Sequence, residues 1–202
     1  MLNSGQRIAT AGACDPANLQ APSEQALMAG WRNGLSIINL RGNPDDAAFR
    51  AAVAGALGLE LPIQPCSSAT DSVRRLVWAG PDEWFLIGPR DPHASTEAQL
   101  RTALQGMHHA VTDVSGGYMV LGIQGAAARD VLAQGCPLDL HPRVFRPGCS
   151  AGSLFFKASI WLWQTDDMPI YEVLVRRSFM GYVWLMLERS TRECGLITHH
   201  LQ

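Results

Sequence analysis

The segment 118–123 (YMVLGI) constrains the fold more than any other part of the chain, because both of its faces are apolar. In an extended strand Met119, Leu121 and Ile123 point to one side, and the residues between them point to the other. A strand that is apolar on both sides has to be covered on both sides. We therefore expect segment 118–123 to be a central strand, entered through a turn at residues 115–117 (SGG).

The hydrophobic periodicity of the remaining chain indicates short strands that alternate with short helices. Asn43 and Ser178 are expected to cap the first and the last helix, and Gly58 to end the first. Strand pairs followed by one-sided helices predict an α+β fold of mixed or antiparallel sheets with strand–strand–helix units. Strands are predicted at 35–40, 73–78, 84–87, 118–123, 154–163 and 170–176, and helices at 43–57, 96–107, 126–133 and 178–187.

The chain is predicted to hold one domain over residues 31–190, either as a single body or as two lobes that divide near residue 108. Residues 1–30 are rich in Ala, Gly, Gln, Ser and Asn without a sustained period, which predicts a flexible N-terminal arm. Residues 191–202 are expected to form a C-terminal tail.

Composition argues against several classes of protein. Charged residues make up 17% of the chain, and its net charge of −2 predicts no attraction to nucleic acid or to an anionic membrane. The longest strongly apolar run, 179–187, is about half of the roughly 20 residues that a membrane span needs. No secretory leader is recognisable and the five cysteines are scattered, which favours a cytoplasmic protein with free thiols.

Residues 148–152 (GCSAG) match the G-x-S-x-G pattern of serine hydrolases. That pattern needs a strand before the serine and a helix after it, so that the serine hydroxyl is held on a strained turn. Here a proline-containing segment precedes Ser150 and a strand-like segment follows it. The context therefore argues against a hydrolase and favours a loop that needs small residues.

Cysteine and histidine side chains suggest no metal site. The spacings of Cys136, His141 and Cys149 fit none of the usual paired zinc ligands, so thiols on a loop are the favoured interpretation. The pair at 108–109 (HH) lies where a helix is predicted to end, and the pair at 199–200 (HH) lies in the tail. Neither pair has an evident partner, and no metal-binding residue is predicted.

Local structure explains the carboxylates, and for Asp166 and Asp167 it is the favoured interpretation. Asp166 and Asp167 could join Glu172 in a cluster for acid–base chemistry, but aspartates are also favoured in a hairpin turn. Asp113 could bind a small polar ligand, or it could only shape the turn before Ser115. No catalytic or cofactor-binding residue is therefore predicted.

The chain has more apolar faces than a single core needs. Trp161 and Trp163 point to one side of their predicted strand, opposite to two aliphatic residues, and Met180 and Trp184 lie off the core stripe of the last helix. Two interpretations stay open: these faces are covered within the chain, or they form an exposed surface that binds a partner. Trp161, Trp163, Met180 and Trp184 are therefore predicted as candidate partner contacts.

Several segments resemble the gamma subunit of heterotetrameric sarcosine oxidase. Between about residue 35 and residue 188 they are 40–46 (LRGNPDD), 58–62 (GLELP), 77–89 (VWAGPDEWFLIGP), 113–116 (DVSG), 128–132 (ARDVL), 135–145 (GCPLDLHPRVF) and 171–179 (YEVLVRRSF). An ordered set of this length is more specific than any single motif. The predicted arm and tail lie outside it.

The resemblance implies a non-catalytic structural subunit of a flavin-dependent enzyme complex. Such complexes oxidise sarcosine to glycine and hydrogen peroxide, and pass the one-carbon unit to tetrahydrofolate. The family implies FAD, FMN, NAD and tetrahydrofolate on partner subunits and none on this chain, with alpha, beta and delta subunits as the partners. It also implies a fold similar to the folate-binding domain of aminomethyltransferases.

A stand-alone folate-binding protein of the aminomethyltransferase type is the alternative, because the segment 113–115 (DVS) faintly resembles part of those enzymes. The K-G-C-Y-x-G-Q-E stretch of related folate-binding regulators is missing, and 145–152 is a poor substitute for it. A homodimeric scaffold with no enzyme attached is a third interpretation.

Overall fold

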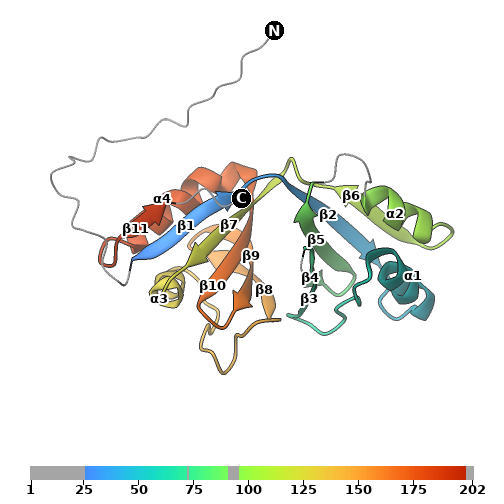
Figure 1. Cartoon of the computed structure of the whole chain (residues 1–202), viewed down its shortest axis with the longest axis horizontal. Coiled ribbons are helices and arrows are strands. Elements are labelled where there is room, and N and C mark those ends of the chain that lie inside the picture. Colours follow the sequence, from blue (N-terminus) through green and yellow to red (C-terminus); the bar gives the residue numbers. More distant parts are fainter. Residues whose placement is uncertain (1–25, 72, 91–95, 199–202) are drawn as a thin grey trace, which may run out of the picture.

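The structure is a computed structural model that describes residues 26–71, 73–90 and 96–198 of the chain. Two β-sheets lie face to face, and a pair of helices covers the outer face of each, which gives four layers in the order α/β/β/α (Figure 1). The predicted α+β class with mixed and antiparallel sheets is confirmed.

The six-stranded sheet has the strand order β11-β1-β7-β10-β9-β8. Neighbouring strands are antiparallel except β1 and β11, which are parallel. Helices α3 and α4 cover its outer face, and a short 3-10 helix, η2, leads into α4. The bounds are β1 (Leu27–Arg32), β7 (Tyr118–Gln124), α3 (Ala128–Ala133), β8 (Ser150–Phe155), β9 (Ala158–Asp166), β10 (Ile170–Arg176), η2 (Arg177–Phe179), α4 (Met180–Ser190) and β11 (Leu196–Thr198).

The five-stranded sheet has the order β3-β4-β5-β2-β6, and all of its neighbours are antiparallel. Helices α1 and α2 pack on its outer face. The bounds are β2 (Leu35–Gly42), α1 (Ala47–Leu57), β3 (Ser68–Thr70), β4 (Arg75–Gly80), β5 (Glu83–Pro89), α2 (Thr96–Ala103) and β6 (His109–Asp113).

Strand β7 is covered on both faces, as the apolar pattern of 118–123 predicts. Leu121 and Ile123 belong to the core between the six-stranded sheet and its helices. Val120 and the half-buried Tyr118 belong to the core between the two sheets. The prediction is confirmed, and β7 lies between β1 and β10 within its sheet.

The core between the sheets is built around aromatic rings. Phe85 of β5 meets Trp161 of β9 edge to face, with 4.9 Å between ring centroids, and its centroid lies 5.4 Å from that of Tyr118. Trp163 and Leu174 are fully buried in the same core. Because all of these contacts join one sheet to the other, the sheets form one packed body.

The N-cap of helix α1 lies three residues later than predicted. Asp46 is its N-cap, since the Asp46 carboxylate accepts the N–H of Ala48 at 2.8 Å. The predicted cap, Asn43, instead accepts the N–H of Asp45 at 3.0 Å in a turn before the helix. Gly58 ends the helix with a left-handed φ of 66°, as predicted.

The predicted strand at 154–163 is in fact a hairpin of β8 and β9. The chain reverses at Phe156 and Lys157, and Phe156 has a φ of 53°, which is uncommon for a residue with a side chain. No Gly or Asn marks this turn, so its sequence reads as a continuous strand. Ser178 does not cap α4, because it lies inside η2 and no side chain caps the α4 N-terminus.

The boundaries predicted for the arm, the lobes and the tail are shifted by β-pairing. Residues 27–30 lie in β1 rather than in the arm, and Leu196–Thr198 of the tail pair with β1 in parallel. The chain crosses between the sheets at 33–34 and again at 114–117, so the division lies after residue 108 and β1 joins the later strands (Figure 1). Residues 1–25 and 199–202 lie outside the described residues.

Within the described residues, the longest helices are too short to cross a lipid bilayer.

Candidate functional site

The two crossings between the sheets border a cavity of about 160 Å³. Its lining includes Arg32 at the end of β1, Arg90 just after β5, and Arg177 at the start of η2. Among the described residues that line it, none is an aspartate or a glutamate. These arginines are far apart in sequence, and no motif brings them together, although Arg177 lies in the family-like segment 171–179; sequence reasoning therefore missed the cluster.

Hydrogen bonds of Ser115 and Asp113 stabilise the second crossing between the sheets, residues 114–117, beside this cavity. The Ser115 hydroxyl accepts the N–H of Ile37 at 2.9 Å and donates to the Asp113 carboxylate. The N–H of Ser115 also donates to the Asp113 carboxylate, at 2.8 Å. The hydroxyl and then the N–H of Ser115 lower the pKa of Asp113, and the Arg90 charge contributes in the same direction. Asp113 therefore shapes the turn, which was one of its two predicted roles.

Glu172 lies on the inner face of β10 and is bound by neighbours. Its carboxylate forms an ion pair with Arg32 and accepts the indole N–H of Trp163 at 2.7 Å. Burial lowers the pKa of Arg75 on the opposite sheet, the Glu172 charge opposes that shift, and the Arg32 charge adds to it. Glu172 thus compensates buried positive charge between the sheets.

The predicted carboxylate cluster does not form around Glu172. Asp166 ends β9 and Ile170 begins β10, so Asp166 and Asp167 lie in or beside the hairpin turn between these strands. The Asp166 carboxylate accepts the N–H of Met168 at 3.3 Å. The turn interpretation is confirmed for these two aspartates.

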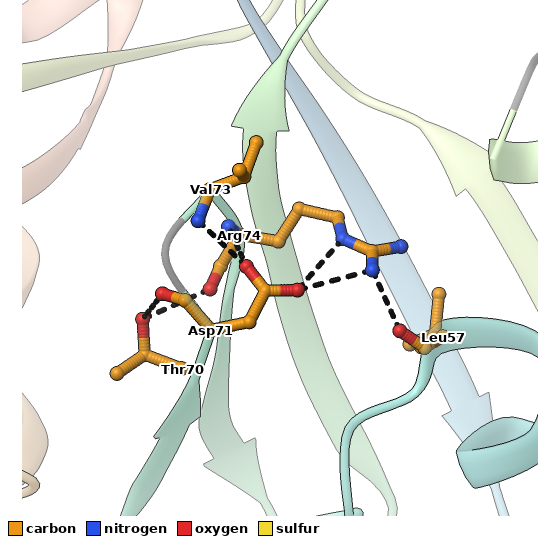
Figure 2. A network of polar contacts seen from close by, with 5 residues as sticks. All are labelled: Leu57, Thr70, Asp71, Val73 and Arg74. Atoms are coloured by element: carbon orange, nitrogen blue, oxygen red, sulfur yellow. Dashed lines mark hydrogen bonds and ion pairs between the residues drawn. The ribbon is translucent and has the colours of Figure 1, made fainter.

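A second polar network joins the loop before β4 to the end of α1 (Figure 2). The Arg74 guanidinium forms an ion pair with the Asp71 carboxylate at 3.0 Å and donates to the carbonyl of Leu57 at 2.6 Å. The N–H of Arg74, followed by that of Val73 and the Arg74 side chain, lowers the pKa of Asp71. Since these groups bond to one another and to the last turn of α1, the network holds the loop in place.

Ser150 is placed as a structural residue. It is fully buried at the start of β8, and its hydroxyl donates to the carbonyl of Ser67 at 2.7 Å. A strand follows it, where a nucleophile elbow needs a helix. The strand predicted after Ser150 is confirmed, so residues 148–152 lack the strand–turn–helix context of a nucleophile elbow.

The thiol and imidazole groups do not converge. Cys136 is buried and its sulfur lies 3.5 Å from the Ser153 hydroxyl, whereas the sulfur of Cys149 lies 3.7 Å from the carbonyl of Val144. His141 is exposed and accepts the N–H of Arg143 at 3.2 Å. In the part of the chain that the structure describes, no group of three potential ligands is arranged to hold a metal ion.

The histidine pairs lie apart from these groups. His108 is exposed, and the ring of His109 in β6 lies 3.0 Å from the carbonyl of Met107. The pair at 199–200 is outside the described residues.

The predicted partner contacts divide into two groups. Trp163 is wrong as a surface residue, because it is fully buried between the sheets and bonded to Glu172. Trp161 also packs between the sheets, although it is only half-buried. Their side of β9 is apolar because a second sheet covers it. The pattern of a single strand does not show whether a second sheet will pack against it.

Trp184 and Met180 lie on the outer layer, in α4, and both are half-buried. The Trp184 ring lies 6.2 Å from the Trp31 ring between centroids, and its N–H donates to Glu188 at 2.8 Å. Phe179 and Leu185 beside them are 40% and 44% exposed. The residues 179, 180, 184 and 185 are called the α4 patch below.

Comparison with known families gives a consistent result. The model of the "sarcosine oxidase, gamma subunit family" matches residues 41–193 of this chain. The sarcosine oxidase subunit gamma of Corynebacterium sp. (strain P-1) is 35% identical over 153 residues, which cover 74% of this chain and 73% of the relative. The subunit of the same name from Arthrobacter sp. is 34% identical over the same shares of both chains.

Solved structures agree with the family match. A chain of the heterotetrameric sarcosine oxidase from Corynebacterium sp. U-96 has a TM-score of 0.79 and 30% identity, covering 85% of this chain and 87% of that one. The glycine cleavage system aminomethyltransferase T from Bartonella henselae has a TM-score of 0.61 at 13% identity, covering 87% of this chain and 48% of the enzyme. This second likeness shows a shared fold, as expected from the sequence.

Proposed function

The chain belongs to the sarcosine oxidase gamma subunit family, and from that premise we propose that it is a non-catalytic structural subunit of a heterotetrameric sarcosine oxidase. The observation that carries the proposal is the likeness in sequence and fold to a chain of such an enzyme over nearly the whole length of both. The complex would oxidise sarcosine to glycine, with tetrahydrofolate as the one-carbon acceptor.

The chemistry of the described residues supports a non-catalytic role. Asp113, Glu172 and Ser150 were the groups best suited to acid–base or nucleophilic work. Each makes a structural contact inside the fold. Asp113 shapes a turn, Glu172 pairs with Arg32 in the layer between the sheets, and the hydroxyl of the buried Ser150 donates to a backbone carbonyl. In keeping with the family resemblance, we assign FAD, FMN, NAD and tetrahydrofolate to the larger partner subunits, and the complex to the cytoplasm.

We assign contact with a larger subunit to the α4 patch. It places two exposed and two half-buried apolar side chains on the outer layer, and the ring of one of them, Trp184, pairs with that of Trp31. Aromatic residues and methionine are enriched in the cores of protein interfaces. Of the four contacts predicted from sequence, Met180 and Trp184 keep this role, Trp161 is secondary, and Trp163 is withdrawn.

Co-expression with the larger subunits, followed by native mass measurement, tests the proposal. The expected result is a particle with one copy of each of four subunits. Met180→Ser and Trp184→Ala should lower the assembled fraction. Met168→Ser is the matched control, because Met168 is 70% exposed in the hairpin between β9 and β10. A chain that stays alone beside its candidate partners and binds tetrahydrofolate would contradict the proposal and favour the stand-alone alternative.

A further inference from the structure

The arginine-lined cavity carries positive charge that the fold only partly balances. Arg32 is paired with Glu172, whereas the interaction of Arg90 with an acidic group among the described residues is a longer-range one, with Asp113. Arg177 donates its Nε–H to the carbonyl of Gly116 at 2.8 Å. Among the described residues, neither the Arg90 guanidinium nor the Nη atoms of Arg177 have a hydrogen-bond acceptor. The chain as a whole carries a net charge of −2, so this is a local concentration of positive charge.

The guanidinium of Arg177 is held in place by the second crossing between the sheets. Its backbone N–H donates to the carbonyl of Gly117 at 2.8 Å, and its Nε–H donates to the neighbouring carbonyl of Gly116. The N–H groups of its two Nη atoms are left for an external acceptor. A fixed guanidinium loses little conformational freedom on binding, and its planar donors match the two oxygens of a carboxylate.

A further arginine lies next to the cavity. Arg176, at the end of β10, stacks over the ring of Tyr118, with 5.9 Å between its guanidinium carbon and the ring centroid. Tyr118 is itself part of the cavity lining. Both Arg176 and Arg177 are exposed, so their charge is available to a molecule that approaches from outside.

The cavity and the α4 patch adjoin each other along the chain at η2. Arg177 and Phe179 belong to the same short helix, η2, and Met180 begins α4 directly after it. A charged cavity beside exposed apolar side chains is the arrangement of a protein interface, in which a polar contact fixes the register of an apolar one. A cavity of about 160 Å³ has room for one acidic side chain with its apolar stem.

We propose that this cavity receives the carboxylate of an aspartate or glutamate from a partner subunit, with Arg177 and Arg90 as the residues that bind it. The proposal rests on the proposed function, because it names the chemistry of the partner surface that would cover the α4 patch. It assigns a role to residues for which neither the sequence motifs nor the family resemblance provides one.

The test compares charge-reversal variants in the co-expressed complex. Arg177→Glu and Arg90→Glu should each lower the affinity of assembly by roughly tenfold or more, since like charges would then meet at a buried contact. The wild-type complex should dissociate more readily as salt is raised, and the variants should lose part of that salt dependence. Arg177→Lys keeps the charge but not the planar fork, so an intermediate loss is expected.

Arg146→Glu is the matched control, because Arg146 is an exposed arginine on the loop before β8 and does not line the cavity. Thermal unfolding of each isolated variant verifies that the fold is intact. If the wild-type chain does not assemble, the proposed function fails. If it assembles, and Arg177→Glu and Arg90→Glu assemble as well as Arg146→Glu, only the present inference is overturned.

A free anion is distinguished in a separate arm of the experiment. Inorganic phosphate or citrate is added to the isolated chain while its unfolding temperature is measured. Stabilisation of wild type but not of Arg177→Glu, together with unchanged assembly of that variant, would assign the cavity to a small anion and overturn the partner carboxylate.

Discussion

At the scale of single residues, Asp113 is the group whose titration should be visible in stability. Its pKa is lowered in the folded chain by two hydrogen bonds from Ser115. A carboxyl group with a depressed folded-state pKa stabilises the fold at pH values above its unfolded-state pKa. That contribution is lost as the pH falls through the folded-state pKa.

Asp113→Asn should therefore lower the free energy of unfolding at neutral pH. Its difference from wild type should shrink as the pH falls below the ordinary aspartate pKa of about 3.9 and on through the depressed folded-state pKa, because the wild-type carboxylate then becomes protonated and loses its contribution. Urea unfolding at a series of pH values measures the effect. Asp167→Asn, in the exposed turn before β10, is the control. An Asp113→Asn difference that stays constant across this range would contradict the assigned role.

Gly42 gives a second prediction at this scale. A Cβ atom added there would lie 2.2 Å from Cζ of Phe49, a ring that is 1% exposed and packs against Trp84. Because a buried ring cannot move aside, Gly42→Ala should destabilise the fold by about 1–3 kcal/mol in denaturant unfolding.

Gly55→Ala is the matched control in the same half of the chain. Gly55 lies in α1 with nothing within 4 Å of its added Cβ, so alanine should stabilise the helix by about 0.5–1 kcal/mol. Changes of the same sign in both variants would show that the contact with Phe49 is not what requires glycine at position 42.

Sequence reasoning at the residue scale identified groups that bond to near neighbours and missed those that bond across the fold. Asp113 and Ser115 are two positions apart, so their turn could be anticipated. Arg32 and Glu172 are 140 positions apart, and their ion pair depends on two strands that only the sheet brings together. The arginines of the cavity were missed for the same reason.

At the scale of elements, the start of α1 shows how local signals compete. Asn43 and Asp46 are both good capping residues, and proline after Asn43 favoured the earlier start. The structure uses Asp46 as the cap and Asn43 in the preceding turn. Asp46→Ala should lower the free energy of unfolding by about 1 kcal/mol, and Asn43→Ala by less. Urea unfolding of the two variants decides between them, and a larger loss for Asn43→Ala would restore the original prediction.

The β8–β9 hairpin could not be predicted from the pattern of apolar residues, which indicates one continuous strand. Its turn relies on Phe156 in a left-handed conformation, and the N–H of Phe156 donates to the carbonyl of Gly135 at 2.7 Å. The ring of Phe156 covers Gly135 so closely that an added Cβ would lie 2.5 Å from it. A contact with the end of α3 therefore stabilises a turn that its own sequence does not signal.

At the scale of the whole molecule, the second sheet explains why Trp163 was wrongly predicted to lie on an exposed apolar surface. Trp163→Ala should destabilise the isolated chain by about 3–5 kcal/mol, because it opens a cavity between the sheets and leaves Glu172 without its indole donor. Trp184→Ala, in the half-buried α4 patch, should cost clearly less stability while weakening assembly. Denaturant unfolding of both variants measures the contrast. Equal losses of stability would contradict the distinction between core and contact surface.

The position of β1 has a consequence for how the protein is made. This strand leaves the ribosome before the rest of the described fold, but it pairs with β7 and β11, and β11 is translated after every other described strand. The five-stranded sheet, by contrast, is complete once β6 has emerged. We expect the nascent chain to form that sheet first, while β1 stays exposed with its backbone N–H and C=O groups unpaired. The protein should therefore depend most on a chaperone in the interval before β11 is translated.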